Sequence, residues 1–428
     1  MSKWIWILVG AVLLFSGMAK NAIAADPVIE MLQEKGVITA DEAQKLYDQQ
    51  AKASPVLTGN AGSKLTIKGR IFAGYFLSDE STSNAPLYSN YGSGSNKNYN
   101  NGSFEVPEAK LQFNWNPMDQ LGVVARLSFG NADNANLKFD YLYAQINKII
   151  PRDPNSRLRL GKIKVDFGEE TWTNNPVENN VGLISNSAFN TNGYDEGIEL
   201  YGNFIPGKFG YTLSVTNANS GTGIDNNTNK AVAAKLFVQP LDTAAANLYF
   251  SGSYYTAGLP DSASKTDFTI AGLGTGTAAA WTRDLWEVDA KSTLFRQDSA
   301  GNKTERAKLG AAYGQFNDNF DHTPSTMDRN GSYYFLEGMY NFTPKIYAGA
   351  RYSIVTLNKK YADTLNGIAN ANEYERTSVG MGYRLNNLVT LKAEYSWNDT
   401  SRMTGTTTGV KAKSLSDNLF AVGLAAAF

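Results

Sequence analysis

The basic residues that recur along the predicted strands are the side chains of this sequence best suited to act on ions. Lysine and arginine recur at alternate positions in these strands, and we predict that they point inward. Seven of them, on the first five strands, would line one sector of a wall: Lys68, Arg70, Lys110, Arg126, Arg159, Lys162 and Lys164. Fixed positive charge beside water attracts anions and repels cations. The chemistry expected here is electrostatic selection of ions, without a covalent step.

A long segment after the fifth strand, residues 167–193, carries the opposite charge. It contains no Lys or Arg, and its acids are Glu169, Glu170 and Glu178. Apolar residues such as Trp172 and Phe189 predict a packed loop, which we expect to fold inward and set its acids across from the basic sector. A field across a narrow point would orient dipolar solutes and slow apolar ones. The alternative is a loop that stays outside.

Other kinds of site are excluded or disfavoured by composition. The sequence has no cysteine and a single histidine, His322. This excludes thiol catalysis, Cys-ligated zinc and any site that needs two imidazoles. We therefore predict no enzymatic activity, no metal and no cofactor. The formal net charge is −1, so nothing indicates a nucleic-acid partner.

The elements that must position these residues are strands. From residue 63 onward the apolar positions alternate with polar ones, which is the period of a strand and not of a helix. Sixteen candidates follow, an even number as expected for a bacterial barrel: 64–77, 104–116, 120–129, 138–147, 157–166, 194–204, 208–217, 230–239, 246–256, 281–295, 304–316, 331–342, 345–357, 374–385, 388–398 and 415–428.

The connections between these strands alternate in length. Short turns, such as 205–207 and 386–387, alternate with long loops rich in Asn, Gly, Ser and Thr, such as 78–103 and 358–373. One end of the sheet therefore has short turns and the other has long loops, an asymmetry that a soluble β-sandwich does not require. Aromatic residues make up 12% of a chain whose mean hydropathy is only −0.33. A lipid-facing outer surface around a wet interior explains both values. The fold predicted is an all-β, 16-stranded antiparallel transmembrane barrel.

The last strand illustrates both faces. Its outer row runs from Phe420 to Phe428, and its inner row is small apart from Leu419. Because this strand would pair with 64–77, we expect the small inner row to leave open water beside Lys68 and Arg70.

The amino-terminal region has a different pattern. Lys3 and the apolar run that follows it, with small residues up to Ala25, predict a secretory signal. Thr39 and Glu42 form a capping box in a short helical hairpin, which is either a plug or tether at the periplasmic mouth or a trimerising coiled coil. The predicted division is a signal peptide at 1–25, a periplasmic helical segment and linker at 26–62, and the barrel at 63–428.

The stretch from Leu160 to Glu170, LGKIKVDFGEE, resembles the "LGxFKxPFG" motif that leads into the constriction loop of phosphate-selective porins of the O/P family. The resemblance implies a 16-stranded outer-membrane barrel, usually a homotrimer, that passes small anions. This sequence has Asp166 where the family usually has proline, and its loop lacks the basic residues that bind phosphate. We therefore expect a less selective channel with mild anion preference.

The function predicted is a porin of the bacterial outer membrane, through which small hydrophilic or anionic solutes diffuse passively. Its other partner would be outer-membrane lipid. The alternative is a structural or scaffold barrel that supports a surface partner such as an electron-transfer protein, although sheathing a protein generally needs a wider barrel.

Overall fold

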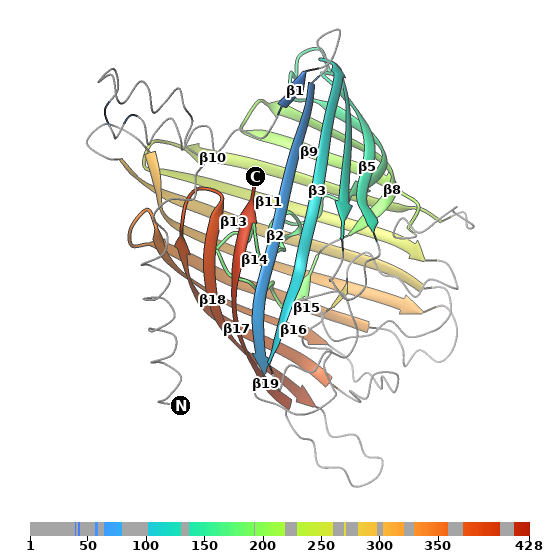
Figure 1. The fold of residues 1–428 in the computed structure, drawn as a ribbon. Helices are drawn as coiled ribbons and strands as arrows, with labels where there is room; N and C mark the ends of the chain where they lie inside the picture. Colours follow the sequence, from blue (N-terminus) through green and yellow to red (C-terminus); the bar gives the residue numbers. More distant parts are fainter. Residues whose placement is uncertain are drawn as a thin grey trace.

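The computed structural model places sixteen strands in one closed antiparallel barrel (Figure 1). It describes residues 39, 42, 56–58, 64–78, 102–129, 137–191, 193–218, 229–259, 269–270, 281–297, 303–320, 329–357, 371–402 and 415–428. The predicted signal peptide and His322 lie outside these residues.

All sixteen predicted strands are confirmed, and their ends differ from the prediction by at most four residues. The barrel strands are β2 (Lys64–Ser78), β3 (Ser103–Met118), β4 (Leu121–Ser128), β5 (Lys138–Asn147), β6 (Arg157–Lys164), β8 (Tyr194–Ile205), β9 (Phe209–Thr216), β10 (Ala231–Asp242), β11 (Ala246–Leu259), β13 (Trp281–Gln297), β14 (Lys303–Phe320), β15 (Arg329–Asn341), β16 (Ile346–Leu357), β17 (Ala371–Arg384), β18 (Val389–Arg402) and β19 (Leu415–Ala427). A short strand, β1 (Val56–Thr58), pairs with the start of β2.

The barrel closes where β19 pairs with β2, as the sequence predicted. Just beyond β19, Phe428 and Gly69 exchange two backbone hydrogen bonds of 2.9 Å. Closure leaves no open sheet edge, which a barrel needs if it is to stand in lipid.

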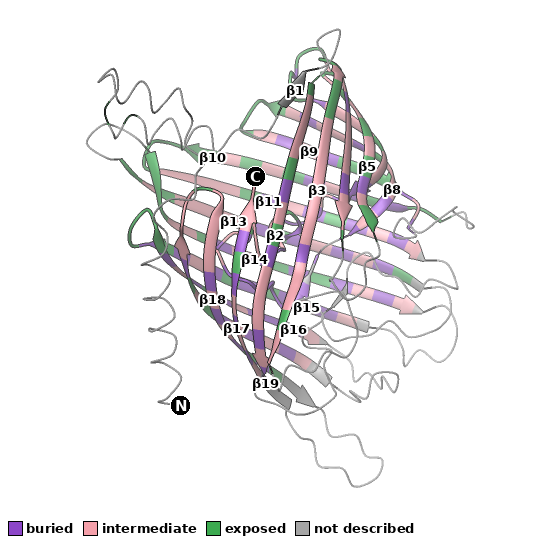
Figure 2. Ribbon diagram, in the orientation of Figure 1, coloured by how far each residue is buried: buried purple, intermediate pink, exposed green. Residues whose placement is uncertain are grey.

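Burial alternates along the strands because successive side chains point to opposite faces (Figure 2). On β15, Glu337 is 5% exposed and its neighbour Leu336 is 62% exposed. Exposed apolar side chains recur at the outward positions of the other strands, among them Leu160, Leu213 and Phe250. A bilayer accepts such a surface, whereas the charged inner positions require water or partners.

The short turns form at the predicted places. Thr343 caps the turn between β15 and β16, because its hydroxyl accepts a 2.9 Å hydrogen bond from the Ile346 N–H. Asn386 does the same between β17 and β18, where its side-chain oxygen accepts from the Val389 N–H at 2.8 Å. These side chains satisfy backbone donors that a two- to four-residue turn leaves open.

Little of the amino-terminal segment is described, but its predicted capping box is present. The Thr39 N–H donates to a carboxylate oxygen of Glu42 at 2.8 Å, and the Glu42 N–H donates back to the Thr39 hydroxyl at 3.3 Å. The remainder of the predicted hairpin lies outside the described residues. In the part of the chain that the structure describes, no helix is long and apolar enough to cross a membrane.

Candidate pore constriction

After β6 the chain does not leave the barrel but turns into it. The Val165 N–H donates to the Gly193 carbonyl at 3.0 Å, so the loop leaves and rejoins the wall at neighbouring points. The loop begins with one helical turn, α4 (Glu170–Thr173), and ends with β7 (Phe189–Asn190). β7 pairs with β12 (Thr269–Ile270), which belongs to the connection between β11 and β13.

Apolar contacts hold the loop against the inner wall. Phe189 stacks on Tyr333 of β15, with ring centroids 3.7 Å apart, and on Phe316 of β14 at 5.6 Å. Gly182 passes so close to Tyr347 that a Cβ atom there would lie 2.2 Å from the ring. These contacts lie in or beside two larger apolar clusters, which bury Val181, Leu183 and Phe189, whereas Trp172 stays 39% exposed.

The loop also covers the inner row of β19. Ile184 packs into one cluster with Phe72, Phe76, Leu419 and Ala421, and all of these side chains are buried. The expectation that the small inner row of β19 leaves open water is therefore wrong. Small residues on β19 instead make room for the loop.

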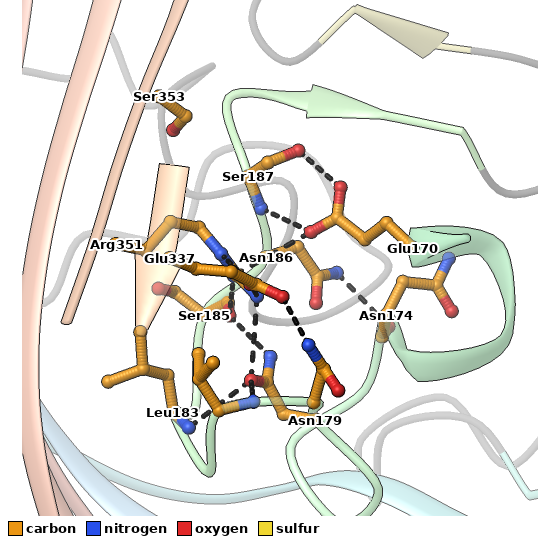
Figure 3. A network of polar contacts seen from close by, with 12 residues as sticks. Glu170, Asn174, Asn179, Leu183, Ser185, Asn186, Ser187, Glu337, Arg351 and Ser353 are labelled. Carbon is orange, nitrogen blue, oxygen red and sulfur yellow. Dashed lines mark hydrogen bonds and ion pairs between the residues drawn. The ribbon is translucent and has the colours of Figure 1, made fainter. Parts of the chain in front are cut away.

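A buried polar network completes the attachment (Figure 3). Arg351 of β16 pairs with Glu337 of β15 at 2.6 Å and donates to the Ser185 carbonyl at 2.8 Å. The other carboxylate oxygen of Glu337 accepts a 2.5 Å hydrogen bond from the side chain of Asn180. On β18, Glu394 accepts from the Ser185 N–H at 3.0 Å. The strand residues here thus supply the partners that the irregular loop backbone cannot find within itself.

The predicted loop acids Glu169 and Glu170 lie in this attachment and do not face the basic sector. Glu169 pairs with Lys235 at 2.6 Å and with Lys291 at 2.7 Å. Burial alone would raise the pKa of Glu169, but the two ammonium groups lower it to about 2. The carboxylate is therefore ionised and neutralised by the wall on which the loop rests. We correct the expectation that it stands across open water from the basic cluster.

Glu170 is buried beneath the loop, and burial raises the pKa of its carboxyl despite the opposing effect of Arg351. It accepts a 2.6 Å hydrogen bond from the Ser187 N–H and contacts the Ser187 hydroxyl. That hydroxyl has one proton and also lies 2.7 Å from the Phe189 carbonyl oxygen. A protonated Glu170 satisfies all three groups, because it can donate to the hydroxyl while the hydroxyl donates to the carbonyl.

Glu178 is the one predicted loop acid that meets the basic sector. Its carboxylate pairs with Arg70 of β2, and its side chain is 54% exposed. Asn175 holds the start of this turn, since its side-chain oxygen accepts from the Glu178 N–H at 2.8 Å. Glu178 thus joins the loop to the basic sector.

The basic sector itself is a chain of alternating charges. Arg70 pairs with Glu108 at 2.6 Å, Lys110 with Asp140 at 2.8 Å, and Arg126 with Asp140 at 3.1 Å. The Arg126 guanidinium also lies 4.1 Å from the ring centre of Tyr141. These contacts fix the cations in place but leave less net charge than the cations alone would give.

Three further members of the predicted cluster have different surroundings. Arg159 pairs with Glu199 at 2.8 Å. Lys164, the last residue of β6, is buried and donates to the Thr171 carbonyl, so it holds α4. Lys68 is exposed, and the register of β2 with β3 places it beside Gln112 on the inner face.

Lys162 does not line the pore. In the sheet it stands directly opposite Leu142 of β5 and Glu196 of β8, and directly opposed residues share a face. Leu142 and Leu160 on that face are exposed apolar residues of the outer surface. The inward assignment of Lys162 is therefore corrected.

Sequence reasoning missed several inward residues. Arg157 lies two positions before Arg159 and therefore shares its face, and the period alone could have identified it. The inward tyrosines Tyr143 and Tyr201 were missed because tyrosine is expected on outer aromatic girdles as well. Among the described residues no group of three or more His, Asp or Glu side chains is arranged to hold a metal ion.

The architecture can be compared with solved structures. The outer-membrane channel DcaP of Acinetobacter baumannii has a TM-score of 0.56 and 13% identity, over 87% of this chain and 99% of that one. The anion-selective porin of Comamonas acidovorans has a TM-score of 0.51 and 13% identity, over 86% of this chain and 100% of that one. OmpT of Vibrio cholerae, in its trimer form, has a TM-score of 0.50 and 14% identity, over 86% of this chain and 99% of that one. Neither a protein-family model nor a curated protein matches the sequence.

These likenesses define the class by fold: the chain is a 16-stranded barrel of the kind found in porins of the bacterial outer membrane. The predicted location in that membrane agrees with this fold and with the apolar outer face. The closer resemblance to the phosphate-selective O/P family stays a prediction.

Proposed function

We propose that this protein is a water-filled channel for passive diffusion of small hydrophilic solutes across a bacterial outer membrane, with a mild preference for anions. The observation that carries the proposal is the position of the loop at 165–193. It rests on the wall from β10 to β19 and also contacts β2, where Ile184 packs against Phe72 and Phe76 and Glu178 pairs with Arg70. The lumen that remains is bounded by the loop and by the sector from β2 to β6.

The charge of that sector supports a mild anion preference. Its inward cations are Lys68, Arg70, Lys110, Arg126, Arg157, Arg159 and Lys164. The carboxylates that contact them are fewer: Glu108, Asp140, Glu178 and Glu199. A solute entering the lumen therefore meets an excess of positive charge, but one reduced by ion pairing.

The alternative of a scaffold barrel predicts a closed or occupied interior. Planar-bilayer recording of the purified protein separates the two functions. Stable, ohmic conductance steps in KCl are the result expected of the channel. A folded barrel that inserts but conducts no current would contradict it and favour the scaffold.

The proposal extends to assembly as a homotrimer, on the resemblance to the O/P family and on the trimeric form of OmpT among the structural neighbours. Cross-linking in outer-membrane vesicles tests it directly. A ladder that stops at three subunits is expected, and a protein that remains monomeric would contradict it.

A further inference from the structure

An arginine and three aromatic rings lie together on the inner wall, apart from the constriction. Arg157 is the first residue of β6. Its guanidinium lies 4.0 Å from the ring centre of Tyr201 on β8. Phe237 of β10 follows at 5.8 Å from Tyr201, and Tyr249 of β11 at 6.0 Å from Phe237, each pair inclined by 17°. We refer to Arg157, Tyr201, Phe237 and Tyr249 as the aromatic strip.

The strip lies near the short-turn end of the barrel, below the loop. Tyr201 is close to the end of β8 at Ile205, and Tyr249 is close to the start of β11 at Ala246. At its far end the Tyr249 hydroxyl donates to Glu169 at 2.8 Å, so the strip reaches the base of the constriction loop.

The backbone makes room for these rings. Between Tyr201 and Phe237 runs β9, where Gly210 stands directly opposite Phe237. A Cβ atom at Gly210 would lie 2.5 Å from the Phe237 ring. Only glycine lets Phe237 lean across the intervening strand toward Tyr201.

Arg157 differs from its neighbour Arg159 in its partners. Arg159 pairs with Glu199 at 2.8 Å, whereas Arg157 has no ion pair among the described residues. Its Nε–H is buried and has no hydrogen-bond acceptor. Because the Nε–H is buried, a carboxylate in the lumen would pair with the two terminal Nη groups, which have no acceptor among the described residues and can donate two parallel hydrogen bonds.

The polar tips of the rings are already engaged. The Tyr201 hydroxyl bonds to Asn203 at 3.3 Å, and that of Tyr249 to Glu169. The strip therefore offers aromatic carbon surface and donors, but few free acceptors. A sugar would need both donors and acceptors, whereas a flat ring that bears an anionic group would use both features of the strip.

From this arrangement we propose that the aromatic strip is a binding subsite for aromatic carboxylates, which pair with Arg157 and lay their ring against Phe237. This inference rests on the proposed channel function and names a class of solute for it. Binding is weak, as passage requires, and it concentrates these solutes at the short-turn mouth.

Benzoate is the probe, with acetate as the anion that lacks a ring. The half-saturating concentration at which each lowers the KCl current is measured on single channels in a planar bilayer, so only folded, open barrels contribute. Wild type should respond to benzoate at a concentration about three- to tenfold lower than to acetate, as expected for one aromatic contact. Phe237→Leu and Arg157→Gln should each remove most of this difference.

Lys68→Gln is the matched control, because it removes one inward positive charge outside the strip. It should leave the ratio of benzoate to acetate unchanged. Equal responses of wild type to the two anions, or equal loss in Lys68→Gln and Arg157→Gln, would overturn the subsite while the KCl conductance still stands. Absence of any KCl current would instead overturn the channel itself.

Discussion

Glu178 of the inner loop forms an ion pair with Arg70 of β2, and this contact links the loop to the basic sector. Glu178 is the only one of the three predicted loop acids that is paired with that sector and more than half exposed at its side chain. Its charge therefore acts on the solution in the channel, whereas the charges of Glu169 and Glu170 act on the attachment of the loop.

Neutralising Glu178 should strengthen the anion preference. Glu178→Gln removes a carboxylate from the lumen, and the ratio of chloride to potassium permeability should rise about two- to fivefold, as expected for one charge a few ångström away in water. The reversal potential in a KCl gradient measures this ratio. Glu196→Gln, on the outer face, is the control and should leave it unchanged. A fall in the ratio for Glu178→Gln would contradict the assignment.

Two lysines test the assignment of faces. Lys68→Gln should lower the anion preference, because Lys68 points into the lumen. Lys162→Gln should not, because Lys162 faces outward beside Leu142. The same reversal-potential measurement decides, and equal effects of the two substitutions would contradict the outward position of Lys162.

Removing Arg351 should release part of the loop. Arg351→Met leaves Glu337 buried without its cation and frees the Ser185 carbonyl. Breaking a buried ion pair in this way should lower the free energy of unfolding by about 3–5 kcal/mol. We expect a larger and noisier single-channel conductance and a lower melting temperature. The double variant Arg351→Met with Glu337→Gln should recover part of the stability. A single variant with wild-type conductance would mean that this network does not hold the loop.

The two buried loop acids should respond to pH in different ways. The pKa of Glu169 is lowered from 4.5 to about 2. Its contribution to docking is therefore complete above about pH 4.5 and is lost as the pH falls toward 2. Burial raises the pKa of Glu170, so its protonation favours the docked loop. Titration of Glu169 should thus leave the conductance unchanged between pH 7 and about pH 5, while protonation of Glu170 as the pH falls should only strengthen the docking of the loop.

Neutral substitutions of Glu169 and Glu170 test these opposite pKa shifts. Glu169→Gln should loosen the loop at pH 7 and increase current noise, because Lys235 and Lys291 lose their shared carboxylate. Glu170→Gln should be close to wild type, since a neutral side chain already suits the site. Single-channel recording at pH 7 compares them, and equal damage by both would contradict the assignment of charge.

The sequence was sufficient for the sixteen strands and for most inward cations, because a barrel wall imposes a strict period of two on every strand. It was insufficient for Lys162, since both faces of β6 carry charge and composition alone does not say which face is wet. The partners of Glu169 could not be predicted, because Lys235 and Lys291 are distant in the chain and become neighbours only when the loop is docked.

The prediction of open water beside the inner row of β19 failed for a related reason. Small side chains such as Ala421 are compatible with open water or with close packing, and only the position of Ile184 decides between them. Period and composition describe each strand, whereas the path of an irregular loop depends on contacts with many strands at once.

The central claim is that solutes pass between the loop and the β2–β6 sector while the inner row of β19 is covered. The absence of native cysteine allows a direct test with single Cys variants and a negatively charged thiosulfonate reagent during current recording. Lys68→Cys should react and change the current, whereas Ala421→Cys, at a position only 1% exposed, should remain protected. Rapid modification of Ala421→Cys together with an inert Lys68→Cys would contradict the account.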